Sequence, residues 1–291
     1  MLMLIEYVER AYAKVNFNLN VLPRRSDGFH SIESIFQTVD LFDLLTVTIS
    51  ENEGCKVVCE ALNLPVQNTL TAAYQAFREC TDCTVPGINV SLKKGIPAGG
   101  GLGGGSSDAA ALIRVLERMC GLKLSEKQLD YIAGKTGSDV FFFMHCDSEG
   151  KGAALVSGRG ECIKKIESRQ DLLLLLVFPA VFSSTKEAYE LVDNDLQMGY
   201  KVKCPDFANL AEIYAQEPKN WGFKNSFTPA LCKKYSAIKE ALDQLKKTGA
   251  EYVEMSGSGS TVFGVFTLRQ QAIYCSNLLA DSWNCVLSQT V

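Results

Sequence analysis

A run of glycines in the first half of the chain has the residue types best suited to binding a phosphate. Six of the seven positions from Gly99 to Gly105 are glycine, and the run leads directly into the apolar pattern of a helix that ends at Gly121. A backbone without side chains lets its amide groups approach a ligand closely, and a helix N-terminus attracts anions. Either Ser106 or Ser107 is expected to cap this helix. We therefore predict a phosphate-binding loop made of Pro97, Gly99, Gly100, Gly101, Leu102, Gly103, Gly104, Gly105, Ser106 and Ser107.

A linker, a Walker loop and a dinucleotide-binding loop agree less well with these residues. A solvated linker rarely runs directly into a helix start. No Gly-Lys-Ser or Gly-Lys-Thr closes the run, as a Walker loop requires. A dinucleotide-binding fold needs an uninterrupted strand before the loop and an acidic residue about twenty positions later, whereas Pro97 interrupts the junction and no such acid follows. The sequence therefore predicts a phosphate loop of a different type.

A second candidate is a row of polar residues near the N-terminus. Residues 11–21 alternate in the manner of a strand, with Lys14, Asn16, Asn18 and Asn20 on one side. Asparagine is a poor strand former, so three on one face carry a propensity cost. A half-exposed strand with a wet face is one interpretation. We favour the wall of a polar pocket.

An aromatic residue and a carboxylate complete the candidates for chemistry. Phe29 and His30 follow an Asp-Gly turn, where they either pack simply or recognise a planar heterocycle. Asp139 precedes the apolar run 140–144, which we predict to be a buried strand. A carboxylate at the mouth of such a strand suits a partly desolvated base, and the alternative is a cap or turn residue.

A second glycine loop, Ser256–Thr261, lies between two predicted strands. Two such loops in one chain indicate a ligand with several phosphates. Two sets of residues are candidates for the adenine pocket: Asn68 with its neighbours, and the pair Lys93-Lys94. The sequence does not choose between them.

These residues must be positioned by a mixture of strands and helices, which predicts an α+β fold with an antiparallel sheet. Ser125 and Gln128 form a capping box, and Thr228, Pro229 and Gly249 bound a long helix. A glycine-rich crossing between domains is expected at 147–161. The predicted strands are 32–49, 88–94, 172–178, 251–255, 261–267 and 284–290, and the remaining predicted helices are 68–80, 125–134, 184–194, 206–216, 229–248 and 268–282.

The composition narrows the class of protein. The chain has 291 residues, 47% of them hydrophobic, which suits one large or two modest domains. The net charge is −4 and the basic pairs are scattered, so nucleic-acid binding has little electrostatic support. Eleven cysteines and an N-terminus (residues 1–6) without a basic leader predict a cytoplasmic protein with free thiols. The pair Cys80 and Cys83 lacks a second pair for zinc, and the apolar run 172–178 is too short to span a bilayer.

Four segments together resemble the three motifs of the GHMP small-molecule kinases. They are Ala13-Lys14-Val15-Asn16, the glycine loop from Pro97 to Ser107, Gly137-Ser138-Asp139, and Ser256–Thr261. The sequence motif Pro-x-x-x-Gly-Leu-Gly-Gly-Gly-Ser-Ser is highly specific to that superfamily. Asp27-Gly28-Phe29-His30 with Ser184–Tyr189 is similar to the branch that acts on a cytidyl-diphospho sugar alcohol in non-mevalonate isoprenoid biosynthesis. The resemblance covers essentially the whole chain.

The resemblance implies a two-lobed α+β fold. A ribosomal-S5-like, ATP-binding lobe is expected at residues 1–165 and a ferredoxin-like, substrate-side lobe at 166–291. The implied reaction is the phosphorylation of the 2-hydroxyl of 4-diphosphocytidyl-2-C-methyl-D-erythritol by ATP, with Mg²⁺ carried on the ATP. No nucleic acid, membrane or obligate protein partner is implied.

The resemblance also implies roles for single residues. Asp139 and Lys14 flank the accepting hydroxyl, the first as the base and the second steadying the developing charge. The resemblance implies that Gly101–Ser107 wrap the phosphates, and the residues themselves make Ser107 the nearest candidate oxygen ligand of Mg²⁺. Phe141 and Ser138 stand where the family commonly has proline and alanine. The implied substrate-binding residues are Asn16, Phe29, His30, Thr185, Tyr189, Gly257, Ser258 and Gly259.

Other functions stay open at this point. A GHMP kinase for homoserine, mevalonate or a sugar has no use for a cytosine clamp at Phe29, His30 and Tyr189. A non-catalytic nucleotide sensor is expected to lack Asp139 or Lys14. A dinucleotide oxidoreductase is the third alternative.

Overall fold

The computed structural model describes residues 5–291, so most of the N-terminal segment that was expected to lack a basic leader, residues 1–4, lies outside the described range. The described chain divides into two compact units that interleave along the sequence. Unit 1 holds the chain up to Ala13, Leu41–Ala98 and Gly103–Lys151. Unit 2 holds Lys14–Asp40, Gly99–Leu102 and Gly152–Val291. The lobe boundary at residue 165, implied by the resemblance, stays a prediction.

Two long strands, β1 (Glu6–Arg24) and β2 (His30–Ile49), contribute residues to both units, and they pair with each other. In unit 1, β4 (Ile88–Lys93) pairs antiparallel with β2, with Leu44 opposite Lys93, and parallel with β3 (Cys55–Cys59). The predictions of strands at 32–49 and 88–94 are confirmed.

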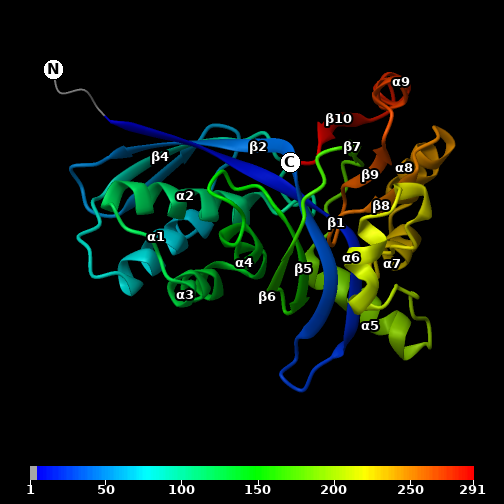
Figure 1. Cartoon of the computed structure of the whole chain (residues 1–291), viewed down its shortest axis with the longest axis horizontal. Helices are drawn as coiled ribbons and strands as arrows, with labels where there is room; N and C mark the ends of the chain where they lie inside the picture. Colours follow the sequence, from blue (N-terminus) through cyan, green and yellow to red (C-terminus); the bar gives the residue numbers. More distant parts are fainter. Residues whose placement is uncertain (1–4) are drawn as a thin grey trace. The chain divides into compact units, whose positions relative to one another are not determined.

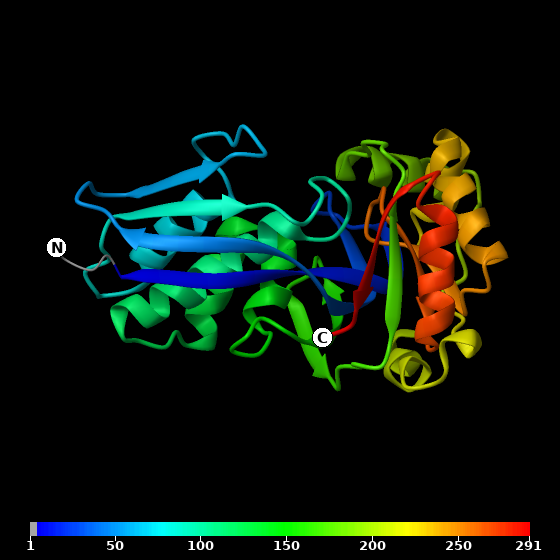
Figure 2. The same cartoon turned by 90° about the horizontal axis from the view of Figure 1, so that it is seen from above.

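Four helices cover one face of these strands in unit 1 (Figures 1 and 2). They are α1 (Thr69–Cys80), α2 (Gly104–Cys120), α3 (Glu126–Thr136) and α4 (Ser138–Met144). Apolar side chains from the strands and helices meet in one core that includes Leu45, Val47, Leu70, Phe77, Val90, Leu112, Leu116 and Ile132.

Local signals placed the starts of α1 and α3 in unit 1, but not that of α2. The Asn68 side chain accepts hydrogen bonds from the amides of Leu70 and Thr71, and Ser125 and Gln128 form the predicted capping box. Helix α2 begins at Gly104, with Gly103 at φ +72° as its N-cap and no side-chain cap. Ser106 and Ser107 therefore lie inside the first turn, and the prediction that one of them caps the helix is wrong. The helix ends at Gly121, as predicted.

The apolar run after Asp139 is a helix, so the prediction of a strand at 140–144 is wrong. Val140, Phe142 and Phe143 of α4 are buried, and α4 packs against α2 and α3. Periodicity does not separate a helix from a strand in so short an apolar run, and packing against the neighbouring helices decides it here.

Unit 2 contains two groups of strands. The hairpin of β5 (Ala153–Gly158) and β6 (Cys162–Ile166) pairs with β2, so the predicted crossing at 147–161 is wrong from Ala153 onward. The second group is an antiparallel sheet in the order β10-β7-β9-β8. Its strands are β7 (Leu173–Phe178), β8 (Tyr252–Met255), β9 (Val262–Phe266) and β10 (Asn284–Gln289), which confirms the predicted strands.

Helices α8 (Ser236–Lys247) and α9 (Arg269–Leu279) cover one face of this sheet (Figure 2). The single helix predicted over 229–248 is instead α7 (Thr228–Lys234) followed by α8, because the backbone of Tyr235 is extended. The N-cap of α7 is Phe227 rather than Thr228. Helix α5 (Thr185–Gln197) is close to its predicted range. Helix α6 (Leu210–Tyr214) is shorter than the predicted helix at 206–216, and a 3₁₀ turn, Phe207–Asn209, precedes it. Within residues 5–291, no helix combines the length and apolar character that crossing a membrane needs.

Candidate active site

The carbonyl groups at the centre of the glycine loop all accept hydrogen bonds within unit 2. The oxygen of Gly100 accepts from the amide of Thr261 at 3.2 Å, and that of Gly101 accepts from the Ser256 hydroxyl at 3.0 Å. The oxygen of Leu102 accepts from the amide of Lys14 at 3.0 Å. Donors of β1 and of the second glycine loop therefore occupy the negative side of these peptide groups.

The amide groups of the same loop are not occupied in this way. Among the hydrogen bonds that join residues 5–291, none has the amide of Gly99–Gly103 as its donor. The next amides, of Gly104–Ser106, lie in the first turn of α2, where a helix offers them no acceptor. Bound carbonyls and open amides together suit an anion, which agrees with the predicted phosphate loop.

Residues 11–19 of β1 are buried on both faces of the strand, and Asn20, the last residue of the polar row, is partly buried. Lys14, Asn16 and Asn18 are at most 3% exposed, so the interpretation as a wet strand face is wrong. The Lys14 ammonium donates to Asn16 Oδ1 at 2.7 Å and lies 4.6 Å from the centre of the Phe36 ring. Asn16 in turn donates to the Ser34 hydroxyl at 3.1 Å. The lysine head is therefore held in a fixed polar setting.

The other two asparagines of the row have structural contacts. Asn18 donates to the backbone oxygen of Glu33 at 3.4 Å, and Asn20 donates to the Glu33 carboxylate at 2.9 Å.

Two of the predicted base-recognition residues meet in unit 2. The imidazole of His30 stacks on the Tyr189 ring, with centres 4.8 Å apart and planes at 17°. Its Nε2 lies 2.8 Å from the Asp193 carboxylate. The edge of the Tyr189 ring meets Phe227, with centres 5.0 Å apart. Phe29 is half exposed, and the guanidinium of Arg159 lies 3.9 Å from the centre of its ring.

Two predicted substrate residues also meet at the start of α5. The hydroxyls of Thr185 and Ser258 are 3.0 Å apart. Ser184 caps α5 by accepting from the amide of Glu187. Gly257 approaches the first glycine loop so closely that a β-carbon there would lie 3.0 Å from the oxygen of Gly101.

Asp139 belongs to unit 1, where it is the second residue of α4 and partly exposed. The residue at the N-terminal boundary of α4, Gly137, lies against the first turn of α2, because a β-carbon on it would be 3.9 Å from the Ser106 hydroxyl. Within unit 1, the turn that carries Asp139 therefore lies beside the end of the glycine loop.

A buried cluster of two carboxylates and one ammonium precedes the glycine loop, and the sequence did not reveal it. The Lys94 ammonium contacts the Asp43 carboxylate and lies 3.2 Å from Asp108 Oδ2. Asp43 Oδ1 accepts from the amides of Gly95 and Ile96 at 2.7 and 2.8 Å. Lys94, an open candidate for the adenine pocket, thus joins the end of β4 to α2.

Burial and the nearby charge of Asp43 raise the pKa of Asp108 to about 8. The same carboxyl keeps a buried oxygen, Oδ1, without a hydrogen-bond partner among the described atoms. An uncharged Asp108 is the form that such surroundings favour.

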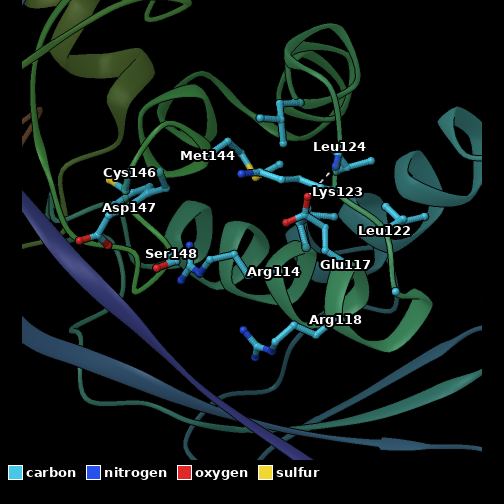
Figure 3. A pocket seen from close by; sticks show the side chains of 14 residues that line it. Arg114, Glu117, Arg118, Leu122, Lys123, Leu124, Met144, Cys146, Asp147 and Ser148 are labelled. Atoms are coloured by element: carbon cyan, nitrogen blue, oxygen red, sulfur yellow. Dashed lines mark hydrogen bonds between the residues drawn. The ribbon is translucent and has the colours of Figure 1, made fainter.

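A cavity of about 600 Å³ lies in unit 1 beside the C-terminal half of α2 (Figure 3). Arg114 and Arg118 on its wall pair with Glu9 at 2.8 and 2.6 Å, and Glu117 accepts from the amide of Leu124. None of the predicted site residues lines this cavity. It lies near the opposite end of α2 from the glycine loop.

Comparison with known proteins agrees with the motifs. The family model described as GHMP kinases N terminal domain matches residues 68–147, and the one described as GHMP kinases C terminal matches residues 203–276. A relative from Treponema pallidum subsp. pallidum, named 4-diphosphocytidyl-2-C-methyl-D-erythritol kinase, is 38% identical over 281 residues, which are 94% of each chain. The chain belongs to the GHMP kinase family. It is an ATP-dependent small-molecule kinase.

Two further comparisons support the fold of this GHMP kinase. A protein of the same name from Pseudothermotoga lettingae is 37% identical over 89% of this chain and 91% of its own. A crystal structure of a 4-(cytidine 5'-diphospho)-2C-methyl-D-erythritol kinase superposes with a TM-score of 0.78 at 26% identity, covering 98% of this chain and 99% of that one. The predicted two-lobed α+β GHMP fold is confirmed.

Sequence reasoning missed several residues around the kinase's candidate site. Asp193 follows Tyr189 by four positions on α5, so helical spacing would have placed both on one face. Arg159 and the cluster of Asp43, Lys94 and Asp108 gave no local signal, because their partners are distant in the sequence.

Proposed function

We propose that this kinase phosphorylates the 2-hydroxyl of 4-diphosphocytidyl-2-C-methyl-D-erythritol, with ATP as the phosphoryl donor, in non-mevalonate isoprenoid biosynthesis. The observation that carries the proposal is the 38% identity to a relative of that name over 94% of both chains. The eleven free cysteines support a cytoplasmic location.

The glycine loop is the proposed site of the ATP phosphates. Phosphoryl transfer depends mainly on positioning and on neutralising charge. The open amides of Gly99–Gly103 and the first turn of α2 offer donors to phosphate oxygens, while the bound carbonyls keep negative oxygens turned toward the protein. In this proposal the residues from Pro97 to Ser107 bind the phosphates.

Mg²⁺ is proposed to arrive with the ATP. This ion usually keeps several waters and binds phosphates with one or two protein oxygens. Within residues 5–291, no group of three or more His, Cys, Asp or Glu side chains could hold a metal by itself. Ser107, in the first turn of α2, is the proposed protein ligand.

Asp139 is the proposed base and Lys14 the proposed electrostatic partner. As the base, Asp139 accepts the proton of the attacking hydroxyl. The Lys14 ammonium, held by Asn16, stabilises the charge that develops during transfer. The backbone amide of Lys14 donates to the oxygen of Leu102 in the glycine loop, so this hydrogen bond connects the strand that carries the lysine directly to the phosphate loop.

The cytosine is proposed to bind at His30, Phe29 and Tyr189. A neutral imidazole that donates from Nε2 to Asp193 keeps Nδ1 as an acceptor. The amino group of cytosine is a donor, so it complements that acceptor. The half-exposed ring of Phe29 offers a stacking surface. Asn16, Thr185 and the loop Gly257-Ser258-Gly259 are the other proposed substrate contacts.

The test is the release of ADP with a panel of alcohols: homoserine, mevalonate, a hexose, and 4-diphosphocytidyl-2-C-methyl-D-erythritol. We expect ADP with the cytidyl substrate alone. Release with another alcohol would assign a different GHMP kinase, and none with any alcohol would favour the non-catalytic sensor. Family membership disfavours the dinucleotide oxidoreductase.

A further inference from the structure

The second glycine loop supports the first through a single buried hydroxyl. Ser256 is fully buried, and its hydroxyl donates to the oxygen of Gly101 at 3.0 Å. The same hydroxyl accepts from the amide of Asn16 at 3.3 Å. Ser256 therefore connects the strand that carries Lys14 to the peptide group at the centre of the phosphate loop.

The position of Ser256 is fixed by the side chain of Asn225. The Asn225 amide nitrogen donates to the oxygens of Met255 and Gly257, each at 2.8 Å, which are the carbonyls on either side of Ser256. Its oxygen accepts from the amide of Phe227 at 2.9 Å. Asn225 is 1% exposed, so no water replaces these bonds at low cost.

The buried carboxylate of Glu254 binds the backbone amide of Asn225. Glu254 accepts from the amides of Asn225 and Met255 and from the Thr228 hydroxyl, at 3.2, 2.9 and 2.6 Å. Burial raises the pKa of Glu254, and these three hydrogen bonds offset part of that effect. The network gives Asn225 no freedom to turn its amide.

We propose that Asn225 is a positioning residue for ATP, acting through Ser256 on the orientation of the Gly101 peptide. Both hydrogens of the Asn225 side-chain amide are needed, because its single nitrogen donates to two carbonyls, those of Met255 and Gly257. An aspartate in this place has the same shape but faces those carbonyls with negative oxygens. The second glycine loop would then shift. The Ser256 hydroxyl, which keeps the Gly101 oxygen turned away from the phosphates, would shift with it. The inference rests on the proposed function only in taking ATP as the ligand of that loop.

The experiment compares Asn225→Asp with the wild type and with Tyr214→Phe. Tyr214 is a matched control in unit 2, because its buried hydroxyl binds Gln37 and the amide of Arg169. We expect Asn225→Asp to raise the Kd and KM for ATP about tenfold, with a smaller rise in the KM for the cytidyl substrate, because Gly257 of the same loop is a proposed substrate contact. Tyr214→Phe should lower the melting temperature without changing either KM.

Equal changes of the ATP KM in Asn225→Asp and Tyr214→Phe would overturn the proposal. A parallel rise of both substrates' KM values in Asn225→Asp would also overturn it. If Asn225→Asp does not fold, Ser256→Ala removes the donor to Gly101 together with the acceptor of the Asn16 amide, and it should raise the ATP KM more than the KM for the cytidyl substrate; an unchanged ATP KM there refutes the proposal. A wild type that does not bind ATP would instead refute the proposed function, and the inference with it.

Discussion

Gly101 has a backbone φ of +75°, and a β-carbon there would overlap the carbonyl oxygen of Ser256. Both features need glycine at this position. The close approach lets the Ser256 hydroxyl reach the oxygen of Gly101, so the open face of the loop presents N–H groups. At the scale of single residues, the polarity of the loop depends on this contact.

We predict that Gly101→Ala weakens ATP binding at least tenfold. It should also lower the free energy of unfolding by more than the cost of placing alanine in a left-handed backbone conformation. That cost is about 1–2 kcal/mol. Gly199→Ala is the control, because Gly199 has φ +82° and nothing lies near its β-carbon position. The measurements are urea unfolding and titration with a non-hydrolysable ATP analogue. Equal effects of the two substitutions would show that the contact with Ser256 is unimportant.

Asp139→Asn should retain ATP binding and lose turnover by roughly a hundred- to ten-thousandfold, because the amide accepts no proton. Asp130→Asn, on the exposed side of α3, is the control and should leave the rate unchanged. Steady-state rates and the Kd for ATP check both variants. Turnover at the wild-type rate in Asp139→Asn would remove this carboxylate from the mechanism.

The junction between β4 and α2 is the element on which the glycine loop depends. Lys94 lies between Asp43 and Asp108, and Asp43 also fixes the backbone that enters the loop at Gly95 and Ile96. Removing one partner of such a buried ionic group leaves an uncompensated charge. The position of the loop entrance is therefore sensitive to the charge of the cluster.

Asp108→Asn should remove part of the pH dependence of stability. The pKa of Asp108 is about 8 in the folded chain against 3.8 for an unperturbed aspartate, so the folded state holds a proton that the unfolded state has released between these values. Stability contributed by this proton is present below about pH 4 and is lost as the pH rises to about 8. The variant should therefore be more stable than the wild type at pH 9.

Urea unfolding at pH 5, 7 and 9 measures this difference. Asp171→Asn is the control, since the hydrogen bond from Arg169 lowers the pKa of Asp171, so this carboxyl is ionised in both states from pH 5 to 9 and its removal should leave the pH dependence there unchanged. Identical slopes for wild type and Asp108→Asn would contradict the assignment of the proton to Asp108.

Elements with signals in their own sequence were predictable. Asn68 and Ser125 marked two helix starts because their caps involve residues two or three positions away. The helix after Asp139 was not predictable, because its packing against α2 and α3 decides it, and no signal in the local sequence marked the break at Tyr235. The cluster of Asp43, Lys94 and Asp108 spans more than sixty positions, so no local pattern reveals it.

The whole molecule is expected to bind two ligands through separate groups of residues. The spelling of the glycine loop was enough to predict a phosphate site and the family, whereas the carbonyl contacts that give the loop its polarity required coordinates. Asn225 and Ser256 belong to the same unit as the imidazole of His30, while Asp139 belongs to the other. Asp139 thus lies between His30 and Asn225 in the sequence but in a different unit from both.

ATP and CMP should each raise the melting temperature, because each binds only the folded chain; at a hundred times Kd the gain is about 2.7 kcal/mol. His30→Ala should abolish the shift caused by CMP and keep the shift caused by ATP. Differential scanning fluorimetry measures both. A wild type without a shift at millimolar CMP would contradict cytosine recognition.

The central claim is the transfer of a phosphoryl group from ATP to the cytidyl-linked alcohol. A ³¹P NMR time course with the purified kinase, ATP, Mg²⁺ and 4-diphosphocytidyl-2-C-methyl-D-erythritol follows that transfer directly. We predict that a phosphomonoester resonance appears at the rate at which the γ-phosphate of ATP disappears. Loss of the γ-phosphate to inorganic phosphate alone, or no change in the ATP resonances, would contradict the account.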